Sequence, residues 1–266
     1  MYQTTYHRAS SVDEAAALFK KGADAKYLAG GHTLLPVMKQ RLAQPSDVID
    51  LARIPALVGV SATADALVVK AATTYYDVMT SADTKKAIPA LVHLTSMLGD
   101  PAVRYRGTIG GSIANNDPAA DYPAAVVALD ATVKTNKRSI RADDFFTGLF
   151  STALEDGEII TEIAFPIPAK AAYAKMRHPA SRFALTGVFV AKTKSGEVRV
   201  AATGASQSGV MRVPAIEAAL KANWSPAALD AVTVSADGLI SDIHGSADYR
   251  ANLVKVMAQR AVTAAG

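Results

Sequence analysis

The chain of 266 residues lacks cysteine altogether. This absence excludes disulfide bonds, thiol catalysis and any iron–sulfur cluster held by cysteines of this chain. The five histidines, His7, His32, His93, His178 and His244, are widely separated. No pair has the spacing of three or four residues that favours a metal site on one chain. Any redox role therefore requires an organic cofactor.

Long apolar runs and a one-sided charge are missing as well. The longest apolar runs, such as Tyr122–Ala131 and Ala184–Lys192, are far shorter than the roughly 20 residues of a membrane-spanning helix. Because the first residues show no signal-peptide pattern, we expect a cytoplasmic protein with no transmembrane segment. The formal net charge is +4, but lysine and arginine are scattered among acidic residues, which argues against nucleic-acid binding.

Half of the residues are hydrophobic and a fifth are charged, so the chain can bury a sizeable core divided into subdomains. Residues 1–52 predict a compact α/β lobe, residues 53–168 a second lobe, and residues 169–266 a C-terminal domain. The segment Pro166-Ile-Pro168 marks the second boundary.

In the first lobe we expect a helix that begins at the capping box Ser11-Val-Asp-Glu14 and a second helix over Leu34–Leu42. The other expected elements are the strands Lys26–Ala29, Val48–Leu51, Leu57–Val60, Leu67–Ala71, Ala131–Thr135, Glu158–Phe165, Ala171–Arg177, Leu185–Lys192 and Glu197–Thr203, and the helices Thr74–Ser81, Pro89–Leu98, Asp121–Leu129 and Val213–Ala222. Two further helices begin at Ser225-Pro226 and at Ser246, the last one with Tyr249, Leu253, Val256 and Met257 inward.

Two turns built on adjacent glycines carry the functional signal. Ala29-Gly-Gly-His-Thr33 lies where a strand gives way to a helix, and Thr108-Ile-Gly-Gly-Ser112 lies in a similar loop. Glycine pairs allow positive φ and let backbone N–H groups approach a ligand. A helix N-terminus behind such a turn favours an anion, so we expect a pyrophosphate. The chain has neither the Rossmann Gly-x-Gly-x-x-Gly nor the phosphate-loop sequence, and a dinucleotide must be held differently.

The sequence around these turns resembles the paired FAD motifs of molybdenum-hydroxylase medium subunits, the group that includes carbon monoxide dehydrogenase and the FAD part of xanthine dehydrogenase. The first motif continues into Leu34-Leu35-Pro36, and the second runs from Arg104 through Ser112 to Asp117-Pro-Ala-Ala-Asp-Tyr-Pro123. The resemblance extends to Ile159–Pro166, Tyr173–Ser181 and Asp242–Arg250. It implies an α+β fold: a two-lobed FAD-binding module of the vanillyl-alcohol oxidase/p-cresol methylhydroxylase type plus a C-terminal α/β domain with a small antiparallel sheet and helices.

By this resemblance, FAD lies between the lobes. The pyrophosphate is bound by Gly30, Gly31, His32 and Thr33 of the first lobe and by Thr108, Gly110, Gly111 and Ser112 of the second, and Ala29 is a further cofactor-binding residue. Relative to the common family pattern, Thr33 replaces Ser and keeps the hydroxyl, whereas Ser112 replaces Asn and loses an amide. His32 belongs to the phosphate turn, where its imidazole can donate, and we assign no catalytic residue.

Five further positions match the family's cofactor site. Asp121 hydrogen-bonds FAD hydroxyls, with a helix N-cap as the alternative role, and Asn115 faces the ligand, with an ordinary loop position as its alternative. Leu34 and Ile160 pack on the isoalloxazine, against the alternative of plain core packing. Lys175 lies near the flavin, where a cation stabilises the anionic reduced form; the alternative is a solvated strand lysine.

The resemblance also implies a division of labour. A large subunit carries molybdopterin, a small subunit with [2Fe–2S] clusters relays electrons, and the FAD of this chain passes them to an external acceptor, in a dimer of heterotrimers. Two alternatives remain. One is a stand-alone FAD oxidoreductase of the same fold, like the cell-wall reductase that acts on enolpyruvyl sugars, with His93, His178 or Tyr173 as proton donor. The other is a scaffold subunit that binds no flavin.

Overall fold

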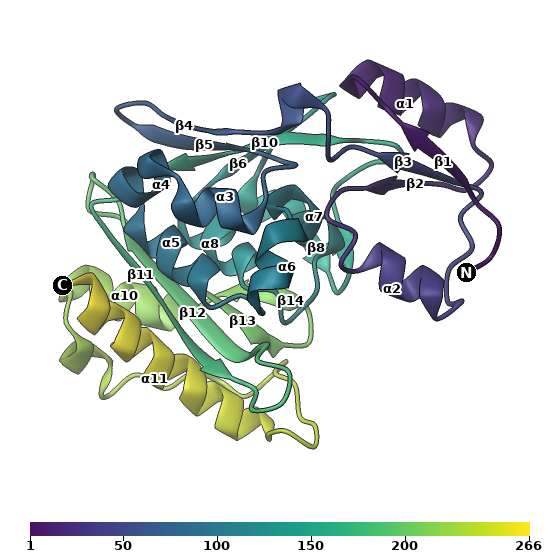
Figure 1. Ribbon diagram of the computed structural model, residues 1–266. Coiled ribbons are helices and arrows are strands. Elements are labelled where there is room, and N and C mark those ends of the chain that lie inside the picture. The colour runs from purple at the N-terminus through teal and green to yellow at the C-terminus, as the bar shows by residue number, and fades with distance from the viewer.

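Three β-sheets follow one another along the chain, each packed against helices (Figure 1). The computed structural model describes residues 1–266. The first sheet is parallel with strand order β1-β3-β2, and the other two are antiparallel. The protein is therefore a mixed α and β fold, as the sequence predicts. None of its helices is both long and apolar enough to cross a membrane.

The first sheet, in the purple N-terminal part of Figure 1, lies between two helices. Its elements are β1 (Thr5–Arg8), α1 (Val12–Lys21), β2 (Ala25–Leu28), α2 (Leu34–Lys39) and β3 (Asp47–Asp50). The oxygen of Ser11 caps α1 by accepting from the N–H of Glu14 at 3.1 Å, but the Glu14 carboxylate accepts from the amide of Ser10 instead of closing the box on Ser11. The second helix ends earlier than expected, because Arg41 adopts a φ of 60°.

The second sheet has strand order β4-β5-β10-β6-β7. Its strands are β4 (Val60–Ala62), β5 (Ala66–Lys70), β6 (Thr132–Thr135), β7 (Ser139–Arg141) and β10 (Ile160–Pro166), and a small ribbon pairs β8 (Phe146–Gly148) with β9 (Ser151–Thr152). The strand expected over Leu57–Val60 is displaced: Pro55–Leu57 forms a 3₁₀ turn (η1), and the strand, β4, begins only at Val60. Pro55 lacks the N–H that a strand ladder needs and stands at the start of this turn.

Short helices lie between the second sheet and the third and form the blue and teal centre of Figure 1. They are α3 (Tyr75–Thr80), α4 (Ala82–Ala87), α5 (Pro89–Ser96), α6 (Pro101–Arg106), α7 (Ile109–Asn115), α8 (Tyr122–Ala128) and α9 (Ala142–Phe145). Every residue of α8 is buried. Such a helix is apolar all round, which fits its place between two sheets.

The third sheet is a meander of β11 (Lys170–Arg177), β12 (Ala184–Lys192), β13 (Val198–Ser206) and β14 (Gly209–Arg212). One face, with Tyr173 and Phe189, joins the core of the central helices, and the other, with Val188 and Val190, packs on C-terminal helices. The C-terminal helices are α10 (Pro214–Ala222) and α11 (Ala247–Ala265).

Two expectations for the C-terminal segment are wrong. The residues after Ser225 form only a 3₁₀ turn, η2 (Pro226–Leu229), which Ser225 caps. Tyr249 is 41% exposed, although Leu253 and Met257 of the same helix are buried as expected. Tyr249 lies in the first turn of α11. Its ring packs beside Gly245, which precedes the helix, and not against the core.

Candidate functional site

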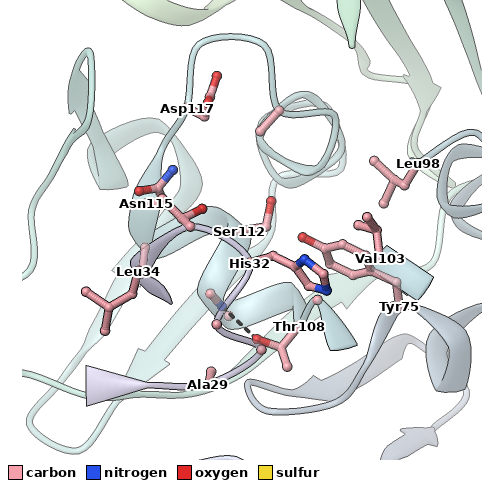
Figure 2. Close-up of a pocket in the computed structure, with 18 of the residues that line it drawn as sticks. Ala29, His32, Leu34, Tyr75, Leu98, Val103, Thr108, Ser112, Asn115 and Asp117 are labelled. Atoms are coloured by element: carbon pink, nitrogen blue, oxygen red, sulfur yellow. Dashed lines mark hydrogen bonds between the residues drawn. The ribbon is translucent and has the colours of Figure 1, made fainter. Parts of the chain in front are cut away.

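A cleft of about 980 Å³ runs between the first sheet and the central helices (Figure 2). Its volume lies at the upper end of the roughly 300–1,000 Å³ usual for small-molecule sites. All of the candidate residues chosen from the sequence line it: Ala29, Gly30, Gly31, His32, Thr33, Leu34, Thr108, Gly110, Gly111, Ser112, Asn115, Asp121, Ile160 and Lys175. Residues far apart in the chain, from Ala29 to Lys175, thus meet in one cavity.

The two glycine bends face each other across this cleft. A Cβ atom placed on Gly30 would lie 2.1 Å from the carbonyl oxygen of Arg106, just before the second bend. A Cβ atom on Gly111 would lie 3.9 Å from the methyl group of Ala29 in the first. The bends are therefore in close contact, and the glycine at position 30 is what allows the backbones to approach.

The first bend offers a row of free hydrogen-bond donors. The N–H groups of the six residues Ala29–Leu34 donate no hydrogen bond within the chain. Gly31 has a φ of +76°, a left-handed conformation that glycine adopts readily, and it turns the chain from β2 into α2. Buried backbone donors normally have partners, so a run of open donors inside a cleft favours an anionic ligand.

The second bend is built differently. Gly110 and Gly111 lie in the first turn of α7, which Thr108 caps, and not in a loop. The amide of Gly110 donates to Ala71 at 2.9 Å, and that of Gly111 donates to the hydroxyl of Thr108 at 3.2 Å (Figure 2, dashed line). What this bend offers a ligand is therefore the hydroxyl groups of Thr108 and Ser112, together with the exposed, Cβ-free surface of Gly111.

Asp121 and Lys175 form a buried ion pair at the wall of the cleft. The Lys175 ammonium lies 2.9 Å from Oδ1 of Asp121, and the side chains are 1% and 2% exposed. Tyr173 donates its hydroxyl to the same carboxylate at 2.5 Å. Burial raises the pKa of Asp121, and the charge of Lys175 and the hydrogen bond from Tyr173 oppose that rise. Lys175 is thus not a solvated strand lysine, and the side chain of Asp121 makes no capping bond.

The remaining candidates divide between surface and core. His32 and Thr33 are exposed in the cleft, and Leu34 and Asn115 are half-buried. Ile160 is 6% exposed and belongs to the main hydrophobic core while it also lines the cleft. For Ile160, core packing and contact with a ligand are therefore compatible roles.

Tyr75, Phe183 and Glu158 are among the lining residues that were not found from the sequence. Tyr75 at the start of α3 points its hydroxyl toward the part of the cleft that holds Ser112 (Figure 2). Burial raises its pKa to about 12, against an opposing hydrogen bond with Ser112. Phe183, in the connection between β11 and β12, lines the cleft although its side chain is 55% exposed. Glu158 lines it just before β10. Of these, only Phe183 had a visible signal, as a bulky residue beside a recognised motif.

The proton donors considered for a stand-alone enzyme lie elsewhere. His93, His178 and Tyr173 are not among the residues that line the cleft. The His178 ring contacts His244 with a nitrogen separation of 3.1 Å, and burial raises the pKa of Tyr173 well above its usual value. None of the three is placed to deliver a proton into the cleft.

A glycine bend with open amides, in a long cleft between two lobes, is typical of proteins that bind a nucleotide cofactor. The chain belongs to the family described as the FAD binding domain in molybdopterin dehydrogenase, whose model matches residues 2–168. It is 36% identical to the carbon monoxide dehydrogenase medium chain of Hydrogenophaga pseudoflava, over 98% of this chain and 96% of the relative. It is 35% identical to the nicotine 6-hydroxylase medium subunit of Paenarthrobacter nicotinovorans, over 98% and 96%.

Solved structures agree with this assignment. Reconstituted CO dehydrogenase from Oligotropha carboxidovorans superposes with a TM-score of 0.90 at 33% identity, covering 99% of this chain and 98% of the other. Quinoline 2-oxidoreductase from Pseudomonas putida 86 gives 0.88 at 29% identity, covering 99% and 97%. The expected family, fold class and FAD-binding domain are confirmed, and the chain is a subunit of an oxidoreductase.

Proposed function

We propose that this chain is the electron-transfer subunit of a molybdenum hydroxylase complex, which accepts electrons from a [2Fe–2S] partner subunit and passes them to an external acceptor. The complex contains a large molybdopterin subunit and a small [2Fe–2S] subunit, as a dimer of heterotrimers in the cytoplasm. The observation that carries the proposal is the row of six unpartnered amides at Ala29–Leu34, which faces a second glycine bend inside one long cleft.

The residues present in the cleft fit FAD. The free amides from Gly30 to Thr33 hold the pyrophosphate, and the hydroxyls of Thr108 and Ser112 add donors from the other side. Gly111 lets the phosphates approach the start of α7, because a Cβ there would point into the cleft. Bound FAD supplies the uptake and release of two electrons, which no side chain of this chain can provide.

The apolar residues of the cleft suit the flavin ring. Leu34 and Ile160 present apolar surface that excludes water, and Phe183 covers the opening from the β11–β12 connection. Asp121 accepts a hydroxyl group of the cofactor. Since Lys175 is paired with Asp121, it acts through its position near the ring and brings little net charge to it.

We propose three structural units that match the three sheets. The cofactor lies between residues 1–52 and 53–168, and residues 169–266 close the cleft from the side through Lys175 and Phe183. The last unit shares a hydrophobic core with the second through Tyr173 and Phe189, so we expect these two units to unfold together and the first to move more independently.

The test is purification of the native protein with whatever binds to it. We expect a yellow preparation that releases FAD on denaturation and contains an iron–sulfur subunit and molybdenum. A monomer that turns over a substrate by itself would establish the stand-alone oxidoreductase instead. A colourless complex that cannot be reconstituted with FAD would show that the chain is only a scaffold.

A further inference from the structure

Strand β11 sends two side chains to one carboxylate. Tyr173 and Lys175 are two residues apart and therefore on the same face of the strand, and both reach Asp121 at the start of α8. Tyr173 is 1% exposed and Asp121 2%. The cluster thus connects the third sheet to the wall of the cleft through fully buried polar groups.

The hydrogen bonds of the Asp121 carboxylate are unevenly distributed. Oδ1 accepts from the Tyr173 hydroxyl at 2.5 Å and lies 2.9 Å from the Lys175 nitrogen. Oδ2 accepts only from Lys175, at 3.1 Å. A carboxylate oxygen has about two acceptor positions. Oδ1 therefore has two donor groups within 2.9 Å, whereas Oδ2 has one, at 3.1 Å, and is the less crowded oxygen. Lys175 also donates to the carbonyl oxygen of Met97 at 3.4 Å, which holds its ammonium group beside the carboxylate.

The fold makes room for the Tyr173 hydroxyl at a specific place. Gly187 on β12 is the register partner of Lys175, and a Cβ on Gly187 would lie 2.0 Å from the oxygen of Tyr173. Any other residue at position 187 would displace the ring. The hydroxyl is therefore held against the backbone of β12 on one side and Asp121 on the other.

We propose that Tyr173 is a positioning residue for the cofactor site: its hydroxyl holds Oδ1 of Asp121, and this orients the carboxylate so that Oδ2, the less crowded oxygen, accepts from a hydroxyl group of the cofactor. This inference rests on the proposed function, because it concerns the same site. Tyr173 itself touches no ligand, and it acts through Asp121.

The protonation of Asp121 depends on the Tyr173 hydroxyl. The hydrogen bond from Tyr173 and the charge of Lys175 and Arg177 lower the pKa of Asp121, against the larger effect of burial. Tyr75 and Tyr122 also face this carboxylate from α3 and α8, and burial keeps both phenols neutral. Removal of the Tyr173 hydroxyl therefore raises the pKa of Asp121, and the carboxyl protonates at a higher pH.

The experiment compares Tyr173→Phe with a matched control, Tyr122→Phe. Tyr122 is equally buried, but its hydroxyl pairs with Thr95 at 2.8 Å and not with Asp121. In the full chain without FAD, the carboxyl carbon resonance of Asp121, assigned through Asp121→Asn, is followed against pH. We expect its midpoint to move to higher pH in Tyr173→Phe and to stay unchanged in Tyr122→Phe.

The second readout is the dissociation constant of FAD in the purified complex as a function of pH. We expect Tyr173→Phe to weaken binding by up to about tenfold, because the Asp121 carboxylate loses the hydrogen bond that orients it toward the cofactor, with a further loss as the pH falls. Superimposable titrations of Asp121 in Tyr173→Phe and the native chain would overturn the inference, and so would an equal shift in Tyr122→Phe. If the native protein binds no FAD, the proposed function fails, whereas the Asp121 titration still decides the role of Tyr173.

Discussion

Gly30 and Arg106 bring the two lobes together: a Cβ on Gly30 would stand 2.1 Å from the carbonyl oxygen of Arg106, and 2.8 Å from the Cα of Gly107. No side chain can be accommodated there without moving backbone. The contact fixes the distance between the two glycine bends, and hence the width of the cleft at the place where we put the pyrophosphate.

Gly30→Ala is therefore expected to force the lobes apart. The alanine methyl group must displace the backbone at Arg106, so FAD affinity should fall by at least about a hundredfold, since small displacements of a binding group are costly. The measurement is the flavin-to-protein ratio after purification and on titration with FAD. The control is Ala29→Gly, which adds no atom at the same bend, and a variant Gly30→Ala with native flavin content would contradict the close approach.

Substitutions of increasing size at Gly111 test whether the second bend contacts FAD. Unlike Gly110, Gly111 is exposed, and a Cβ there would come within 4 Å only of the Thr108 hydroxyl, at 2.9 Å, and of Ala29. We expect Gly111→Ala to weaken FAD binding and Gly111→Val to abolish it, because the branched methyls enter the cleft.

In both Gly111 variants the far-ultraviolet circular dichroism should remain that of the native chain. Gly110→Ala serves as the contrast, since its Cβ would meet the backbone of Ala71 at 2.6 Å, and it should lower stability as well as flavin content. Unchanged flavin content in Gly111→Val would mean that this bend does not contact the phosphates.

The sequence located the residues of the cleft better than it located some of the elements around them. Each candidate position lines the cleft, because two glycine pairs occur together in one chain and their neighbours match a family pattern; their contacts with FAD stay a prediction. What remained hidden depends on tertiary contacts. Nothing in the sequence showed that the amides of Gly110 and Gly111 are consumed by hydrogen bonds within the chain, or that a distant strand residue, Tyr173, reaches Asp121.

Periodicity also failed where the chain is irregular. The apolar run Leu57–Val60 looks like a strand, but Leu57 ends a 3₁₀ turn that Pro55 starts, and the strand begins only at Val60. The short helices α4 and α6 were missed, because six residues carry too little periodicity to distinguish them from loops. Tyr249 has helical spacing with Leu253, yet it lies outside the core.

Glu158 predicts a pH dependence of stability. Burial raises its pKa, but hydrogen bonds from Arg138, the Glu155 amide and Thr135 outweigh that effect and lower it to about 2. A carboxylate with a lowered pKa stabilises the fold above its unfolded value, 4.5, and this contribution disappears as the pH falls toward 2. Glu158→Gln should therefore lower the free energy of unfolding at neutral pH by about 1 kcal/mol, a figure reduced for the solvent exposure of Arg138.

The measurement for Glu158 is urea unfolding of the native chain and Glu158→Gln at several pH values. The difference between them should be constant near neutral pH and shrink between pH 4.5 and about 2. Glu155→Gln is the control, because that side chain is 57% exposed. A difference that grows on acidification would have the wrong sign for this mechanism.

Arg250 holds helix α11 to the third sheet. It is 3% exposed, donates to the carbonyls of Leu185 and Gly204 at 2.7 Å, and pairs with both oxygens of Asp242. Arg250→Met leaves these acceptors without their donor, and we expect a loss of about 3 kcal/mol in the free energy of unfolding, measured by urea denaturation. The control, Arg260→Met, changes an exposed residue of the same helix and should cost less than about 0.5 kcal/mol.

Phe183→Ala should change solvent access to the flavin without changing the stability of the fold. The Phe183 side chain is 55% exposed but lines the cleft, so Phe183→Ala should change the free energy of unfolding by less than about 0.5 kcal/mol. If Phe183 covers the flavin ring, its removal lets water and small solutes reach the ring, and iodide should quench the flavin fluorescence several-fold more strongly. Ile243→Ala is the matched control, because Ile243 is 94% exposed and does not line the cleft. Equal quenching in Phe183→Ala and Ile243→Ala would show that Phe183 does not shield the flavin ring. Another residue would then cover it.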